Sequence, residues 1–325
     1  MDRDERGFAE GIVGDGRSLI SLTALCLALS GTFAILESAT GELLPHDVAF
    51  LRMSRQDLCS INECRIVHFM IHDRVSFGGS LIAIAALYLW LAEFPLRAGQ
   101  TWAWWTLVGS GIVGFGSFLT YLGYGYLDTW HGVATLLLLP CFLAGLWLSR
   151  RIVHQTSSES GQSSRLLLAP SPEPAWSSPE GIGRVFLLFA AAAMIVAGFT
   201  IQIIGMTSVF VPTDLTFMGM TRAHLDAINP RLVPLIAHDR AGFGGGVATA
   251  GLLTACSVWW GTPSRSLWQA LMSGGIVGWG TAIGVHPIIG YTDAIHLLPA
   301  IAAAALYFGG LALIRPAMFT NSGRP

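Results

Sequence analysis

Lysine is absent from this sequence of 325 residues, and charged residues of any kind are scarce. All 18 Lys/Arg positions are arginine, charged residues make up 12% of the chain, and the formal net charge is −2. Nucleic-acid binding depends on clustered positive charge, so this balance indicates no nucleic-acid partner. The chain also lacks a Walker phosphate loop and any zinc-finger spacing, which removes the commonest nucleotide and structural-zinc motifs.

Apolar residues take the place of the missing charges. They make up 53% of the chain, and several runs reach the ~20 residues that a helix needs to cross a bilayer. The sequence therefore predicts an all-α integral membrane protein in contact with the lipid bilayer. We expect eight transmembrane helices, at residues 18–38, 76–94, 101–123, 129–149, 184–206, 241–260, 267–286 and 294–314.

A polar string occurs twice in this apolar chain. His72-Asp73-Arg74, followed by Phe-Gly-Gly, returns at the same spacing as His238-Asp239-Arg240, again followed by Phe-Gly-Gly. Charged and imidazole groups are costly near a bilayer, so their presence in both halves indicates a function. Further polar residues match between the halves: Asp47 with Asp214, Arg55 with Arg222, Arg65 with Arg231, Asp128 with Asp293, and His131 with His296.

These matches predict a duplication. The first four-helix repeat covers residues 1–149 and the second 184–325, with a Ser/Pro-rich linker at 150–183. Four spans in each half give both repeats the same orientation in the membrane. Arginines flank one set of loops, so the positive-inside rule places both termini and the linker in the cytoplasm of a cell (inner) membrane protein. Loops 39–75 and 207–240 are then extracytoplasmic.

The matched histidines are candidate ligands. If each half folds as its own bundle, His72 meets His131 and His238 meets His296 near the outer face. Two histidines at one depth suit the axial positions of a haem or two ligands of a metal ion. Asp128 and Asp293 lie three residues before a histidine, where a carboxylate can orient the ring. The alternative is that Asp73, Asp128, Asp239 and Asp293 cap helices.

The paired outer arginines suit an anionic partner. Guanidinium groups bind carboxylates and phosphates, so a haem propionate, a lipid phosphate or a substrate acid would fit Arg55, Arg65, Arg74 and their repeat partners. Internal salt bridges to the matched aspartates are the alternative. Residues without a repeat partner are interpreted separately: Cys59 and Cys64 as a candidate disulfide, and His46, His68, His154 and His286 as incidental.

The layout of helices and histidines resembles the haem A synthase family. Members have eight membrane helices in two four-helix halves, a histidine pair on the second and fourth helix of each half, and often a cysteine pair in the first outer loop. Here His72, His131, His238 and His296 take those positions, and Cys59 and Cys64 the loop position. The resemblance implies a haem b in each half or in one of them, bound by His72 and His131 or by His238 and His296.

Three functions are compatible with the sequence, and whether the protein is an enzyme stays open. The first is binding or transport of an anionic lipid, a quinone or a small acid at the outer face. The second is a redox protein with bis-histidine haem, and the third is a metal-dependent membrane hydrolase. The ligand-binding set expected for the first is His72, Asp73, Arg74, Asp128, His131, His238, Asp239, Arg240, Asp293, His296, Arg55, Arg222, Arg65 and Arg231.

Overall fold

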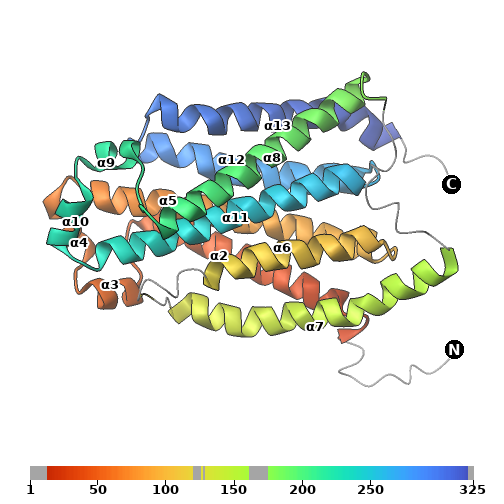
Figure 1. The fold of residues 1–325 in the computed structure, drawn as a ribbon, viewed down its shortest axis with the longest axis horizontal. Coiled ribbons are helices and arrows are strands. Elements are labelled where there is room, and N and C mark those ends of the chain that lie inside the picture. The colour runs from red at the N-terminus through yellow and green to blue at the C-terminus, as the bar shows by residue number, and fades with distance from the viewer. Residues whose placement is uncertain (1–12, 120–125, 127–128, 161–174, 321–325) are drawn as a thin grey trace.

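A computed structural model describes residues 13–119, 126, 129–160 and 175–320, and this part of the chain is helical without strands (Figure 1). Its long helices are α2 (Arg17–Thr40), α5 (Arg65–Leu91, extended by the π-helical turn η1, Ala92–Leu96), α6 (Thr101–Leu119), α7 (Thr129–Ser160), α8 (Pro179–Met206), α11 (Leu232–Trp260), α12 (Arg265–Ile289) and α13 (Ala294–Thr320). Short helices α3 (Pro45–Leu51), α4 (Arg55–Ile61), α9 (Pro212–Met218) and α10 (Arg222–Ile228) gather at one end of the bundle.

Six of the long helices are apolar and long enough to cross a membrane, namely α2, α5 with η1, α7, α8, α11 and α13. This agrees with the expected integral membrane protein. The helices α6 and α12, which the sequence also predicts as spans, are rich in glycine and tryptophan and are not among these six. Hydropathy alone is therefore a weak indicator of a membrane span in helices that are rich in small residues.

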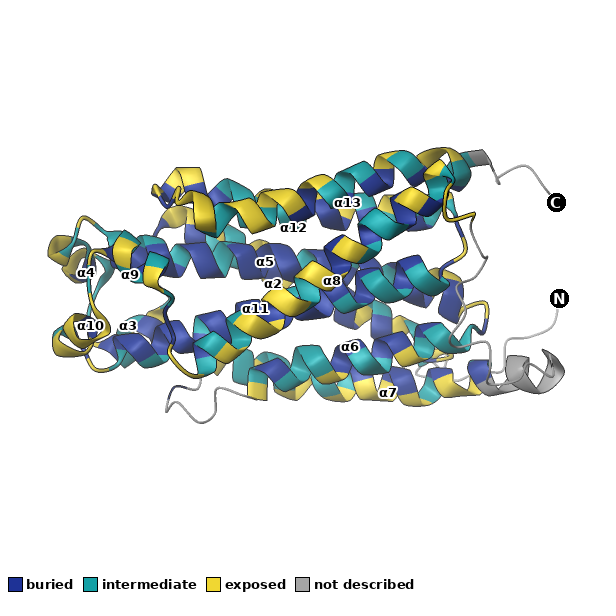
Figure 2. Cartoon of the chain, turned by 45° about the horizontal axis from the view of Figure 1, so that its top comes forward, coloured by how far each residue is buried: buried dark blue, intermediate teal, exposed yellow. Residues whose placement is uncertain are grey.

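Helices α5 and α11 form the centre of the bundle. In the most apolar stretch of each, 78% of the residues are buried, against 22–33% in the other four candidate spans. Figure 2 shows this as two dark helices surrounded by helices with exposed outer faces. Both central helices begin earlier than expected, at Arg65 and Leu232, so the His-Asp-Arg strings lie within helices and not in loops.

The two halves interlock through these central helices. Helix α12 packs along α5 and α6 packs along α11, so the third long helix of each half lies against the second long helix of the other. Two adjacent glycines make this possible, because Gly78 touches Gly31 of α2 while Gly79 faces Thr281 of α12. In the second half Gly244 touches Gly198 of α8 and Gly245 faces Ser117 of α6. The repeated Gly-Gly pair is thus a helix-packing element with one side for each half.

Candidate functional site

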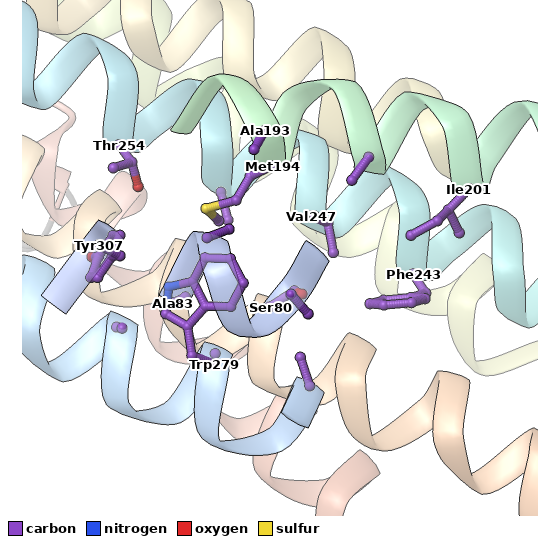
Figure 3. Close-up of a pocket in the computed structure, with 18 of the residues that line it drawn as sticks. Ser80, Ala83, Ala193, Met194, Ile201, Phe243, Val247, Thr254, Trp279 and Tyr307 are labelled. Atoms are coloured by element: carbon purple, nitrogen blue, oxygen red, sulfur yellow. The ribbon is translucent and has the colours of Figure 1, made fainter. Parts of the chain in front are cut away.

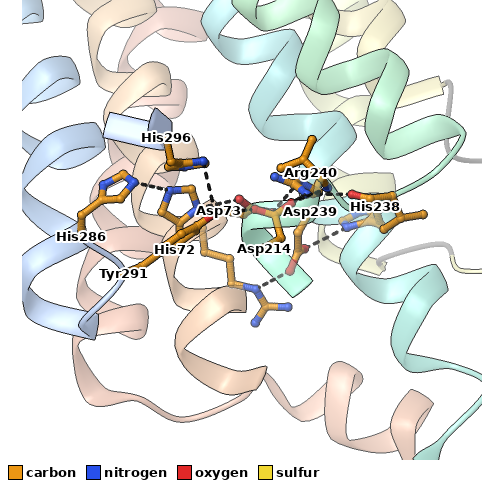
Figure 4. A network of polar contacts seen from close by, with 12 residues as sticks. His72, Asp73, Asp214, His238, Asp239, Arg240, His286, Tyr291 and His296 are labelled. Carbon is orange, nitrogen blue, oxygen red and sulfur yellow. Dashed lines mark hydrogen bonds and ion pairs between the residues drawn. The ribbon is translucent and has the colours of Figure 1, made fainter. Parts of the chain in front are cut away.

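A buried ion-pair network joins the two His-Asp-Arg strings (Figure 4). The guanidinium of Arg74 binds Asp47 of α3 through Nη1 and Asp239 of α11 through Nε, both at 2.8 Å. Each arginine therefore bridges an aspartate from its own half and one from the other. The second set repeats the pattern with the halves exchanged, with Arg240 bound to Asp214 through Nη1 and paired with Asp73 at 3.5 Å through Nε.

Tyrosines and amides complete the network at the short-helix end. Tyr126 donates to Asp47, and the hydroxyl of Tyr291 donates to Oδ1 of Asp214 at 2.9 Å. Further cross-half contacts again come in pairs, with Asn62 bound to the carbonyl of Met218, Asn229 to that of Leu51, Arg65 to that of Phe217 and Arg231 to that of Phe50. These contacts fix the ends of α5 and α11 against the opposite half.

The network carries an excess of negative charge. Two arginines face four aspartates, which leaves a formal charge of −2 when the imidazoles are neutral. Asp47, Asp73 and Asp214 are at most 1% exposed, so solvent screens this charge little. The internal salt bridges expected as the alternative are therefore present for Arg74 and Arg240. Both guanidinium groups are therefore already paired with aspartates and offer no unpaired positive charge to an anionic ligand.

The other expected arginines also have partners in the short-helix region. Arg55 lies 3.6 Å from Glu42, and Arg65 lies 3.3 Å from Glu63. Arg222 pairs with Asp226 at 4.0 Å, one turn along α10. These exposed pairs are weak, because solvent screens them. The arginines thus stabilise the loops and are not gathered into one pocket.

Three histidines meet beside the network. His72 of α5 lies with its Nε2 at 3.2 Å from Nε2 of His286 on α12. The ring of His296, on α13, is 5.7 Å from that of His72 and 5.2 Å from that of His286. One nitrogen from each of the three side chains lies within 4.8 Å of the other two. Hydrogen bonds orient two of the rings: Nδ1 of His72 donates to Asp73 at 2.8 Å, and Nδ1 of His296 donates to the hydroxyl oxygen of Tyr291 at 3.2 Å.

The remaining two histidines form a separate pair. Nδ1 of His131 lies 2.9 Å from Nε2 of His238, whose Nδ1 contacts Asp239 at 3.1 Å. The four histidines that match between the halves therefore meet across the halves, His72 with His296 and His131 with His238, which corrects the expected pairing of His72 with His131 and of His238 with His296. The cause is the exchange of α6 and α12 between the central helices. Axial haem ligands have the macrocycle between them, and rings in direct contact leave no room for it.

His286 is the residue that the sequence interpretation missed. It has no repeat partner, since the matched stretch of the first half holds Tyr121 and Leu122 at the corresponding place. The interpretation of His286 as incidental depends on this lack of a partner. A histidine that is 3% exposed in an otherwise apolar helix is itself a signal, because such a group is kept only where it has a role.

The capping interpretation holds for one described aspartate. Asp293 accepts the backbone N–H of His296 at 2.9 Å, at the start of α13. Asp73 and Asp239 lie inside their helices, whose first turns follow Cys64 and Arg231, so they do not cap them. Asp128 lies outside the described residues. Just before α5, a disulfide joins Cys59 of α4 to Cys64.

An apolar cavity leads away from the three histidines. It has a volume of about 250 Å³ and runs between α5, α8, α11, α12 and α13. His72, His286, His296 and Arg240 line its polar end. Figure 3 shows its apolar part, with Trp279, Phe243 and Met194 around the space and Tyr307 near its far end. The cavity thus combines a long apolar lining with polar groups at one end, the usual make-up of a small-molecule site.

Comparison with known proteins assigns no family to this chain. The site is therefore interpreted from its own chemistry, beginning with the cavity and the histidines. Neither a protein-family model, nor a curated protein, nor a solved structure matches the chain.

Proposed function

We propose that this protein binds a quinone-type amphiphile, with its carbonyl head at His72, His286 and His296 and its apolar tail in the cavity. The protein would be built of two tandem four-helix repeats with eight helices in the cell (inner) membrane. The single observation that carries the proposal is the apolar cavity ending at a group of imidazoles.

The dimensions of the cavity favour a ligand with a chain. Its lining extends along α5 from His72 to Leu87, which is roughly 22 Å at the rise of an α-helix. Between these ends the lining consists mainly of small and apolar side chains, such as Ala83, Val247 and Ala303. A small acid would leave most of this apolar surface unfilled. An isoprenoid or alkyl tail would fill it and gain about 0.8 kcal/mol for each buried CH₂ group.

The charge of the site favours a neutral head group. The buried network beside the histidines has a formal charge of −2, and Arg240 is already paired with Asp214 and Asp73. An anionic lipid head would therefore meet net repulsion at this end of the cavity. Quinone carbonyls are neutral, so a quinone head adds no further negative charge to this end of the cavity. Among the ligands compatible with the sequence, the quinone is thus best supported.

The orientation expected from the sequence belongs to the same proposal. The cytoplasmic side would hold the start of α2 and the end of α13, opposite the short helices (Figure 1). Arg97, between η1 and α6, and Arg265, at the start of α12, support this by the positive-inside rule. The Cys59–Cys64 disulfide at the short-helix end fits an oxidising compartment. The head group would then lie near the extracytoplasmic face.

Filling the cavity should weaken ligand binding. Ala303→Phe places a ring in the space beside α5, whereas Ala302→Phe, one residue away, places it on the exposed face of α13. Quinones quench tryptophan fluorescence, so a decyl-substituted benzoquinone can be titrated against the purified chain in lipid nanodiscs. We expect Ala303→Phe to weaken binding at least about tenfold, which is 1.4 kcal/mol, and Ala302→Phe to leave it unchanged. Equal affinities for all three proteins would refute the proposal.

A further inference from the structure

We infer that His72, His286 and His296 bind one divalent transition-metal ion, with an open coordination position toward the cavity. Nothing in this inference requires the ligand to be a quinone, because it depends on the three side chains and their neighbours. The three come from α5, α12 and α13, so the ion would join helices from both halves. Three imidazoles and one open position form the ligand set of many catalytic metal sites.

The hydrogen bonds of two histidines use Nδ1 and leave Nε2 as the nitrogen that can bind a metal. Nδ1 of His72 contacts a carboxylate oxygen of Asp73, which only accepts, so Nδ1 carries the proton and Nε2 the lone pair. The hydroxyl of Tyr291 donates to Asp214, so its oxygen accepts the proton of His296 Nδ1. Nε2 of His296 then also carries a lone pair. Such partners on the second ring nitrogen are the usual means of preparing a histidine to bind a metal.

The spacing of the nitrogens fits a single ion. With metal–nitrogen bonds of about 2.0–2.1 Å, two ligands of a tetrahedral ion lie about 3.3 Å apart. Nε2 of His72 and Nε2 of His286 are 3.2 Å apart, and all three candidate nitrogens lie within 4.8 Å. For all three nitrogens to reach one ion, His296 therefore has to approach the other two histidines. Since α13 begins only two residues before it, at Ala294, this end of the helix can adjust.

The surrounding charge calls for a cation. The arginine–aspartate network leaves a formal charge of −2, and Asp73, which contacts His72, is 1% exposed. A buried charge without compensation is costly. A divalent ion held by three neutral imidazoles would neutralise the excess. Neutral imidazole ligands suit zinc, iron, copper and nickel and disfavour magnesium and calcium, which prefer oxygen.

The chain contains its own comparison for this site. His131 and His238 form the related pair, next to Asp239, but Tyr121 and Leu122 occupy the stretch that holds His286 in the second half. Because only the second half has the third histidine, His286, we expect one ion per chain. The same comparison supplies the control, because His131→Ala disturbs a buried histidine contact without touching the three-histidine group.

Cobalt titration of the purified full-length chain tests the inference. Co²⁺ replaces zinc in such sites and shows intense visible bands when its coordination is tetrahedral. We expect one Co²⁺ per chain by elemental analysis and an affinity that falls about 100-fold or more in His286→Ala. Asp73→Asn should weaken binding about 10–100-fold, as loss of a hydrogen-bond partner of a ligand does. His131→Ala and the exposed His224→Ala should titrate like the native chain.

The native chain alone also decides the question, should His286→Ala fail to fold. Its thermal midpoint should rise with Co²⁺ concentration and fall when a chelator is added, since an ion that binds only the folded state stabilises it. A native chain that takes up no Co²⁺, or one whose bands persist in His286→Ala and vanish in His131→Ala, overturns the inference. Quinone titration of the chelator-treated chain separates metal binding from quinone binding. A quinone that binds the metal-free chain would support the proposed function independently of the metal site.

Discussion

Replacement of Arg240 with methionine is expected to lower the free energy of unfolding by about 3–5 kcal/mol. The side chain is 4% exposed and pairs with Asp214 and Asp73, which are at most 1% exposed. Methionine has a similar length but leaves both carboxylates buried without a positive partner. The cost comes mainly from these uncompensated charges and not from lost packing. Equilibrium unfolding in urea, followed by tryptophan fluorescence in detergent micelles, measures the change.

Two further variants make this result specific. Arg222→Met removes a 48% exposed side chain that pairs with Asp226 on the surface, and it should cost no more than about 0.5 kcal/mol. The double variant Arg240→Met/Asp214→Asn should be more stable than the sum of its single changes predicts, since one orphaned charge is removed together with its partner. Additive effects, or a loss below 1 kcal/mol in Arg240→Met, would show that the network does not hold the halves together.

A side chain at Gly244 should separate α8 from α11. A Cβ there would stand 2.6 Å from the carbonyl oxygen of Gly198 and 2.5 Å from the backbone nitrogen of Gln202. Both neighbours are backbone atoms, so a rotamer change cannot relieve the contact. We expect Gly244→Val to lower the free energy of unfolding by about 3 kcal/mol or more, at the upper end of overpacking effects. The same urea experiment measures it.

Gly280→Val is the matched control for this prediction. Gly280 also lies inside a long helix, but it is exposed and a Cβ there meets no atom within 4 Å. Valine has an equal intrinsic helix propensity at both sites, so the difference between the variants isolates the contact with α8. Similar stabilities of the two variants would mean that the helices are not packed through Gly244.

The sequence predicted the helical membrane class and the residues of the network, but not their partners. Hydropathy and the repeated strings identify which segments are helical and which positions carry charge. They contain no information on which helix lies beside which, because Gly78 and Gly79 look alike in sequence although one contacts α2 and the other α12. The pairing of the histidines depends on that choice, and so a within-half pairing was expected where a cross-half one is found.

The sequence matches between the two halves misdirect one interpretation. Matching the halves gives weight to residues that occur twice, and His286 occurs once. It is nevertheless the side chain nearest to His72, with 3.2 Å between their Nε2 atoms. A similar error affects the interpretation of Asp73 and Asp239 as caps, because that interpretation places the starts of the two helices beside them. Both helices begin about two turns earlier, since ion pairs across the halves allow a charged string to be buried.

The exchange of helices between the halves sets the order in which the molecule can mature. Arg74 is synthesised more than a hundred and sixty residues before Asp239. Until Asp239 follows, Asp47 is the one of its two aspartate partners that is present. The face of α5 that packs against α12 is likewise uncovered until α12 has been synthesised. The first half therefore lacks the second partner for Arg74 and a neighbour for one face of α5 until the second half has been synthesised.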